Sequence, residues 1–152
     1  MTIRDYRPGT PMSRSAAYVA IPSSSCVDGT WTPTNASTVT GIVYVPCAVN
    51  LTKAGRYDAT IAAEGLITVT ARGITVGPGS AQRGAVALVG GAPGTSVTLV
   101  GADTTVLGQV VGSAAVRATG ARTAMSCGAV GSSIYIGGAD SSATLGTWCV
   151  PG

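Results

Sequence analysis

The sequence predicts an all-β domain, a sandwich or a barrel. Residues 51–72 indicate this most clearly, because apolar and polar side chains alternate along two runs, 57–63 and 67–72, separated by Glu64-Gly65. Alternation with a period of two lets each run bury one face and expose the other. Turn signals rich in glycine and proline recur about every 8–12 residues, as is typical of sandwiches and barrels. The 152 residues suffice for one domain with a real core.

Residues 1–14 are expected to form an extended arm, since Pro8, Gly9 and Pro11 oppose regular structure. Two interpretations stay open: a disordered tail, or a tether that becomes ordered on a neighbouring surface. Residues 15–152 then form a single β-sandwich domain. In the tether interpretation, the contacts with the partner come from Arg4, Tyr6, Arg7 and Arg14.

The strands after the arm each end at a turn signal, and proline ends the first three, at Pro22, Pro33 and Pro46. Glycine between the two central runs predicts a β-hairpin. No exact internal repeat is found, so a solenoid or propeller is not expected. The other predicted strands are 15–21, 29–34, 37–45, 85–89, 96–100, 105–111, 114–119, 123–127, 132–137 and 143–150.

The composition points to a protein that packs against copies of itself or a partner. Only 10% of the residues are charged, although a lone soluble domain usually carries about a quarter. The rival interpretation is an extracellular domain with a neutral surface. A net charge of +3 is far from the basic footprint of a nucleic-acid-binding protein. No run approaches the ~20 apolar residues of a membrane span, and the N-terminus does not read as a secretory signal.

The residues that usually carry catalysis are sparse. Without histidine, imidazole-dependent nucleophiles are excluded and a zinc site has no support. Asp58 and Glu64 share the predicted hairpin and are the candidate carboxylate pair of a glycosidase, or simply charges at turns. We therefore expect no enzyme, cofactor or metal. Trp31 and Trp148 are expected either to stack on a ligand or to anchor a core or subunit interface.

The four cysteines, Cys26, Cys47, Cys127 and Cys149, either form two disulfides or remain buried thiols. The first and last strands of many sandwiches are neighbours. If a bridge forms, we therefore expect it between Cys26 and Cys149.

Two segments, 49–64 with Gly55 and Tyr57, and 127–152, resemble the tumour-necrosis-factor-like and complement-globular-head jelly rolls. The resemblance covers about a quarter of the chain, and the aromatic-rich core of those domains is missing. It implies a jelly-roll-like antiparallel β-sandwich of about 8–10 short strands and a homotrimer.

The chain also resembles phage virion accessory proteins, which are small, weakly charged β domains with an N-terminal arm. This resemblance implies a capsid decoration or cement protein, made in the cytoplasm of a bacterial host and located in the virion. Its partners would be copies of itself and the major capsid protein or another virion protein, with no nucleic acid or membrane. The alternative is a receptor- or glycan-binding module of a tail fibre or cell surface.

Overall fold

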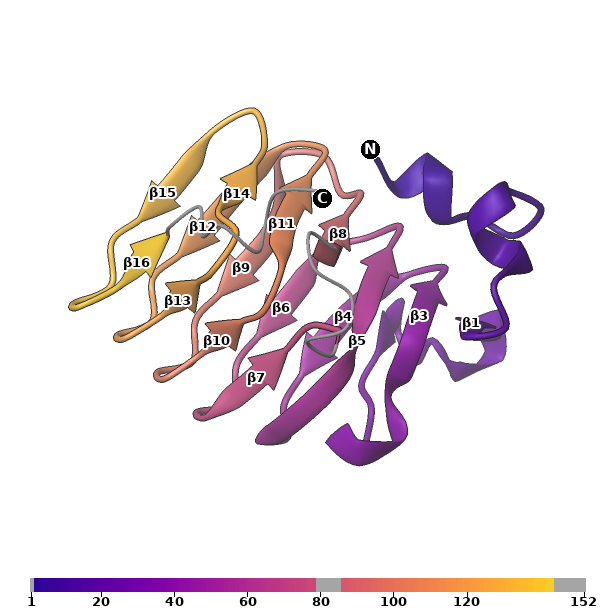
Figure 1. The fold of residues 1–152 in the computed structure, drawn as a ribbon, viewed down its shortest axis with the longest axis horizontal. Coiled ribbons are helices and arrows are strands. Elements are labelled where there is room, and N and C mark those ends of the chain that lie inside the picture. Colours follow the sequence, from indigo (N-terminus) through magenta and orange to yellow (C-terminus); the bar gives the residue numbers. More distant parts are fainter. Residues whose placement is uncertain (1, 79–85, 144–152) are drawn as a thin grey trace.

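The computed structural model describes residues 2–78 and 86–143 and shows a β-solenoid of about six turns (Figure 1). The predicted antiparallel jelly-roll sandwich is wrong, because every pairing between the named strands is parallel. Parallel neighbours need a long connection between them. Here the chain makes that connection by running along the other faces of the solenoid.

Three sheets, A, B and C, form the faces of the solenoid. The long strand β5 belongs to two of them, since its beginning pairs with β7 and the rest with β3 and β8. Sheet A contains β1 (Tyr18–Ala20), β3 (Thr40–Val45), most of β5 (Gly55–Ala63), β8 (Val86–Gly90), β11 (Gln109–Gly112) and β14 (Ala129–Val130). Sheet B contains β2 (Thr30–Trp31), β4 (Ala48–Leu51), β6 (Ile67–Val69), β9 (Thr95–Leu99), β12 (Ala115–Ala118) and β15 (Ile134–Ile136). Sheet C contains the start of β5, then β7 (Ile74–Val76), β10 (Thr105–Val106), β13 (Ala124–Met125) and β16 (Ser142–Ala143).

The register repeats at a nearly fixed interval. In sheet B, Val49 lies beside Ile67, 18 residues later, and Val97 lies beside Val116, 19 residues later. The interval between Ile67 and Val97 is longer, 30 residues, and includes residues 79–85, which the structure does not describe. Each turn thus stacks the same position of one turn on that of the next.

The core consists of columns of aliphatic side chains that run along the solenoid. One column in sheet B is Val49, Ile67, Val97 and Val116, and all four are fully or almost fully buried. Burying each such side chain contributes about 1.5–3 kcal/mol. The predicted core of Val, Ile, Leu and Ala is therefore present, although its strands are connected differently.

The predicted hairpin in residues 51–72 does not form. The strands β5 and β6 lie on different sheets, and β6 pairs with β4 and β9. Gly65 lies at the corner between them, where an added Cβ would come within 2.7 Å of the backbone nitrogen of Ala48 in the previous turn. Glycine is needed here because successive turns approach closely.

Residues 2–14 fold back onto the outer face of sheet A. They contain the 3-10 helices η1 (Ile3–Tyr6) and η2 (Pro11–Arg14), and Ile3 and Tyr6 are buried against Tyr44 and Ala62. This outer face is apolar, whereas the outer positions of sheet B include Thr68 and those of sheet C include Thr75. The arm covers an apolar strip of its own chain.

A disulfide joins Cys26 and Cys47 and links the first turn to the second. The predicted Cys26–Cys149 bridge is therefore wrong, and Cys149 lies outside the described residues. No cysteine in residues 2–78 or 86–143 is free. Two more 3-10 helices, η3 (Ser23–Ser25) and η4 (Ala36–Thr38), also belong to the first turn.

Candidate functional site

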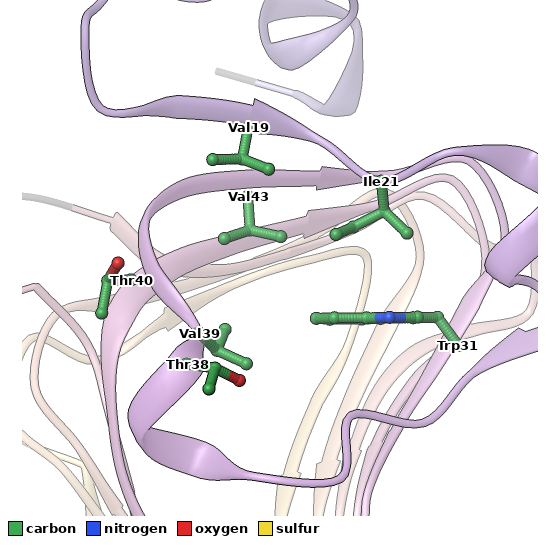
Figure 2. Close-up of a pocket in the computed structure, with 7 residues that line it drawn as sticks. All are labelled: Val19, Ile21, Trp31, Thr38, Val39, Thr40 and Val43. Atoms are coloured by element: carbon green, nitrogen blue, oxygen red, sulfur yellow. The ribbon is translucent and has the colours of Figure 1, made fainter.

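A cavity of about 270 Å³ opens at the N-terminal end of the solenoid (Figure 2). It lies where the interior columns begin, so side chains that would face a preceding turn border open space instead. Strand β3 and the residues around it provide one wall, and Trp31 on β2 provides another. The lining residues are Val19, Ile21, Trp31, Thr38, Val39, Thr40 and Val43.

Local features of the sequence hold these walls. Asn35 caps η4, because its side-chain oxygen accepts a hydrogen bond from the backbone nitrogen of Ser37 at 3.0 Å. The backbone nitrogen of Ile21 donates to the oxygen of Tyr44 at 2.8 Å. Trp31 pairs with Val49 of the next turn, so its indole caps the column of sheet B. The cavity is thus held by covalent, backbone and packing contacts.

Of the two predicted ligand or interface aromatics, the structure places Trp31 in the cavity wall, half-buried and packed against the core. Trp148 lies outside the described residues. The composition could not show that Trp31 ends a column, because that position depends on which strand pairs with β2.

The predicted arm residues divide into two groups. Arg4 and Arg14 are exposed. Tyr6 is only 3% exposed, and burial, with Asp5 nearby, raises the pKa of its phenol to about 12. Arg7 binds Glu64 with both ends of its guanidinium, with nitrogen–oxygen distances of 2.7 and 2.8 Å.

Glu64 is the point to which the arm is fixed. Its carboxylate accepts hydrogen bonds from Arg7 and, at 2.7 Å, from the phenol of Tyr44. The Arg7 hydrogen bond is the main cause that holds the pKa of Glu64 below its ordinary value of 4.5, against the opposing effect of burial. A charged Glu64 therefore favours the docked arm.

The other half of the predicted carboxylate pair lies elsewhere. Asp58 is exposed near the start of β5 and lies 3.7 Å from Arg56, whereas Glu64 follows the end of that strand. The structure does not bring the two carboxylates together in a pocket. Within the described ranges, no group of three or more metal-ligating side chains is found. No helix in the described part of the chain is long and apolar enough to cross a membrane.

A row of charges at the corner between sheets B and C was not predicted. Asp103 binds Arg72 of the previous turn and Arg122 of the next, with the Arg72 Nε–Oδ2 distance 3.0 Å and the Arg122 Nη2–Oδ2 distance 3.1 Å. The Arg122 hydrogen bonds are the main cause that lowers the pKa of Asp103 to about 2. Asp140, one turn beyond, interacts electrostatically with Arg122.

A sequence signal for this corner does exist. Three short segments, GADT at 101–104, GART at 120–123 and GADS at 138–141, recur at intervals of 19 and 18 residues. The expectation that the sequence has no useful repeat is wrong, because this short motif recurs once per turn.

The C-terminal end of the solenoid is the second open end. Within the described residues, β14, β15 and β16 have a neighbouring strand on one side only. Val130, Ile134 and Tyr135 there are 45–51% exposed. The guanidinium of Arg117 lies over the Tyr135 ring, 4.8 Å from its centroid. This turn, formed by β14, β15 and β16, is called the terminal turn below.

No protein-family model, curated protein or solved structure matches this chain. Function is therefore inferred from the geometry of the cavity, the arm and the terminal turn.

Proposed function

We propose that this chain is a non-enzymatic structural protein of a virion, a capsid decoration protein that binds the assembled shell through the terminal turn. The observation that carries the proposal is the open strand edge of β14, β15 and β16, with Val130, Ile134 and Tyr135 exposed beside it. Unpaired strand edges join readily to other chains. Apolar side chains beside such an edge add buried area to the contact.

The composition supports a protein that works within an assembly. Charged residues make up only 10% of the chain, and the charged side chains at the corner of sheets B and C neutralise one another. Little electrostatic repulsion therefore opposes close packing against a partner. Decoration would act by mass action, because a protein that binds only the assembled shell stabilises that shell. An interface of the usual size, about 1,600 Å², suffices for specificity.

The arm contributes to binding through its exposed residues. Arg4 and Arg14 are accessible on the outer surface of the arm, whereas Tyr6 and Arg7 already contact their own chain. We therefore assign the arm's shell contacts to Arg4 and Arg14. Contacts through Tyr6 and Arg7 would first require the arm to leave sheet A.

Co-sedimentation of the purified chain with expanded capsid shells tests the proposal. Ile134→Lys places a charge at the open edge and is expected to weaken binding at least tenfold, because an unpaired charge in an interface is costly. Val27→Lys is the matched control, since Val27 is 71% exposed and lies in the first turn. Equal binding by the two variants would contradict docking through the terminal turn.

Two further measurements complete this test. Removal of residues 2–14 is expected to weaken shell binding through loss of Arg4 and Arg14, and unchanged binding would remove the arm from the proposal. The proposed homotrimer predicts three times the chain mass of 14.9 kDa in sedimentation equilibrium.

The second candidate is a receptor- or glycan-binding module of a tail fibre or cell surface. The exposed Tyr135 ring, with Arg117 stacked on it, favours this candidate because aromatic rings next to cations form platforms for ligands. A glycan array separates the two candidates. Binding of one glycan class that Tyr135→Ala abolishes, without shell binding, would favour the receptor module.

A further inference from the structure

The cavity at the N-terminal end has the chemistry of a small-ligand site. Five of its lining residues are apolar, two carry hydroxyls and none is charged. Its volume of about 270 Å³ exceeds the roughly 150 Å³ of an apolar cavity that holds benzene in another protein, and it approaches the lower end of ordinary ligand pockets. A charged ligand would lose its hydration here without gaining a partner.

The shape of the cavity favours a flat ring. Figure 2 shows the Trp31 indole edge-on, with one face turned toward Ile21 and Val43. Aromatic rings pack against each other in stacked or edge-to-face arrangements that gain about 0.5–1.5 kcal/mol beyond the area they bury. A planar, apolar ring therefore fits this wall better than a flexible chain of the same volume.

One polar group sets the orientation of the ring. The Thr38 hydroxyl lies on the side of the cavity toward Trp31 (Figure 2). It already donates its hydrogen to the backbone oxygen of Asn35 at 2.8 Å, so toward a ligand it can act only as an acceptor. A ligand that meets it must carry a donor.

We propose that this cavity binds a neutral phenol, with the ring against Trp31 and the phenolic hydroxyl donating to Thr38 Oγ1. The walls are held before any ligand arrives, by the Asn35 cap, the backbone contact of Ile21 and the Cys26–Cys47 disulfide. Such preorganisation reduces the entropy lost on binding. The site is distinct from the terminal turn and does not depend on the proposed shell binding.

Titration with p-cresol tests the site, followed by ligand-observed NMR on the unaltered protein and by Trp31 fluorescence in a Trp148→Phe variant. Saturable binding is expected. Thr38→Val removes the acceptor at nearly constant volume and is expected to weaken p-cresol binding about three- to tenfold. Toluene has no hydroxyl, so its binding should not change. An equal loss for both compounds would overturn the hydrogen bond to Thr38.

A filling variant tests the location. Val19→Phe places a ring into the cavity from a side chain that is 47% exposed, so the fold should tolerate it while p-cresol binding is lost. Val27→Phe, at an exposed valine that does not line the cavity, should bind p-cresol normally. Absence of saturable p-cresol binding to the folded wild-type protein, or normal binding by Val19→Phe, would overturn the proposal.

A phenol can reach the cavity as a free molecule or as a tyrosine side chain of a partner. A blocked Gly-Tyr-Gly peptide distinguishes the two sources: displacement of p-cresol by the peptide indicates a tyrosine of a partner chain. Failure of the peptide to compete indicates a free phenol. Shell binding by the Val19→Phe variant reports separately on the proposed function.

Discussion

At the scale of single residues, the corner between sheets B and C explains why one short motif recurs. Gly120 lies where an added Cβ would come within 2.3 Å of the backbone oxygen of Gly101 in the previous turn. Two residues later, Arg122 has a φ of 55° in the left-handed region, and Thr123 donates to the oxygen of Gly120 at 2.9 Å. Close stacking requires the glycine, and the hydroxyl satisfies a carbonyl that the corner leaves without a backbone partner.

Replacing that glycine is the most direct test of the stacking. Gly120→Ala is expected to reduce the free energy of unfolding by about 1–3 kcal/mol, because the methyl group forces two turns apart. Urea denaturation measures the change. The control Thr119→Ala, at the exposed neighbouring residue, should stay within about 0.5 kcal/mol of the wild type. Similar stabilities for the two variants would contradict the contact between turns at Gly120.

At the scale of elements, the arm and β5 show how neighbours decide the role of a segment. Proline and glycine in the arm do exclude a regular α-helix or strand, and the arm forms two short 3-10 helices. Its place on sheet A depends on Ile3, Tyr6 and the Arg7–Glu64 pair. The strand β5 has the expected alternation, yet it supplies two sheets because it bends across a corner.

The docking of the arm should depend on pH. The folded-state pKa of Glu64 is lowered, so its contribution is present above the ordinary pKa of 4.5 and is lost as the pH falls through the lower folded value. Because Arg7 is largely exposed, the effect should not exceed about 1 kcal/mol. Hydrogen exchange of residues 2–14 should therefore speed up severalfold between about pH 6 and about pH 3, after correction for intrinsic rates.

Glu64→Gln is the control for this titration, because it removes the ionisable group and keeps the size of the side chain. Its arm should exchange faster than that of the wild type near pH 6 and change little on acidification. Asp103 also has a lowered pKa, but it lies at another corner, so the arm amides separate the two effects. Unchanged protection of the wild-type arm at low pH would refute the role of Glu64.

At the scale of the whole molecule, the solenoid is a stack in which each turn contacts mainly its neighbours. Stability in such proteins is approximately a sum of the stabilities of the turns and of the interfaces between them. The interior columns run unbroken from Val49 to Val116 in sheet B and from Val43 to Val110 in sheet A. One complete turn should therefore be removable without loss of register.

Deletion of residues 98–116 tests this property. Thr98 pairs with Arg117, so the deletion joins Val97 to the residue that occupies the equivalent position one turn later. The shortened chain is expected to keep its β-type circular dichroism and a cooperative transition at a lower midpoint. Deletion of residues 98–107, about half a turn, should abolish cooperative unfolding because later strands lose register. Similar behaviour of the two deletions would refute the repeating register.

The sequence allowed several features to be predicted and left others open for a physical reason. The alternation in residues 57–63 and 67–72 identified two strands and their buried faces. A period of two is the same in parallel and antiparallel sheets, so it could not identify the neighbours of a strand. Glycine at position 65 suits both a hairpin and a solenoid corner. The GADT, GART and GADS segments were the available clue, but they are short and span only the last three corners.

The candidate sites were predicted less completely than the strands. Trp31 was identified as a residue with ligand or interface potential, but its cavity exists only because the first turn has no turn before it. The partner of Cys26 could not be deduced, since four cysteines allow three connectivities. Val130, Ile134 and Tyr135 resemble other strand residues in the sequence. Their exposure results from their place in the terminal turn.

The sequence by itself determined the all-β character, the aliphatic core, the low charge and the glycine-marked corners, because these depend on residue type and local spacing. Only the tertiary structure decided that the strands are parallel, that the arm covers its own sheet, and that a cavity and an open edge lie at the two ends. Those features depend on which distant segments pair, and the free energy of that pairing comes from whole columns of side chains rather than from any single stretch of sequence.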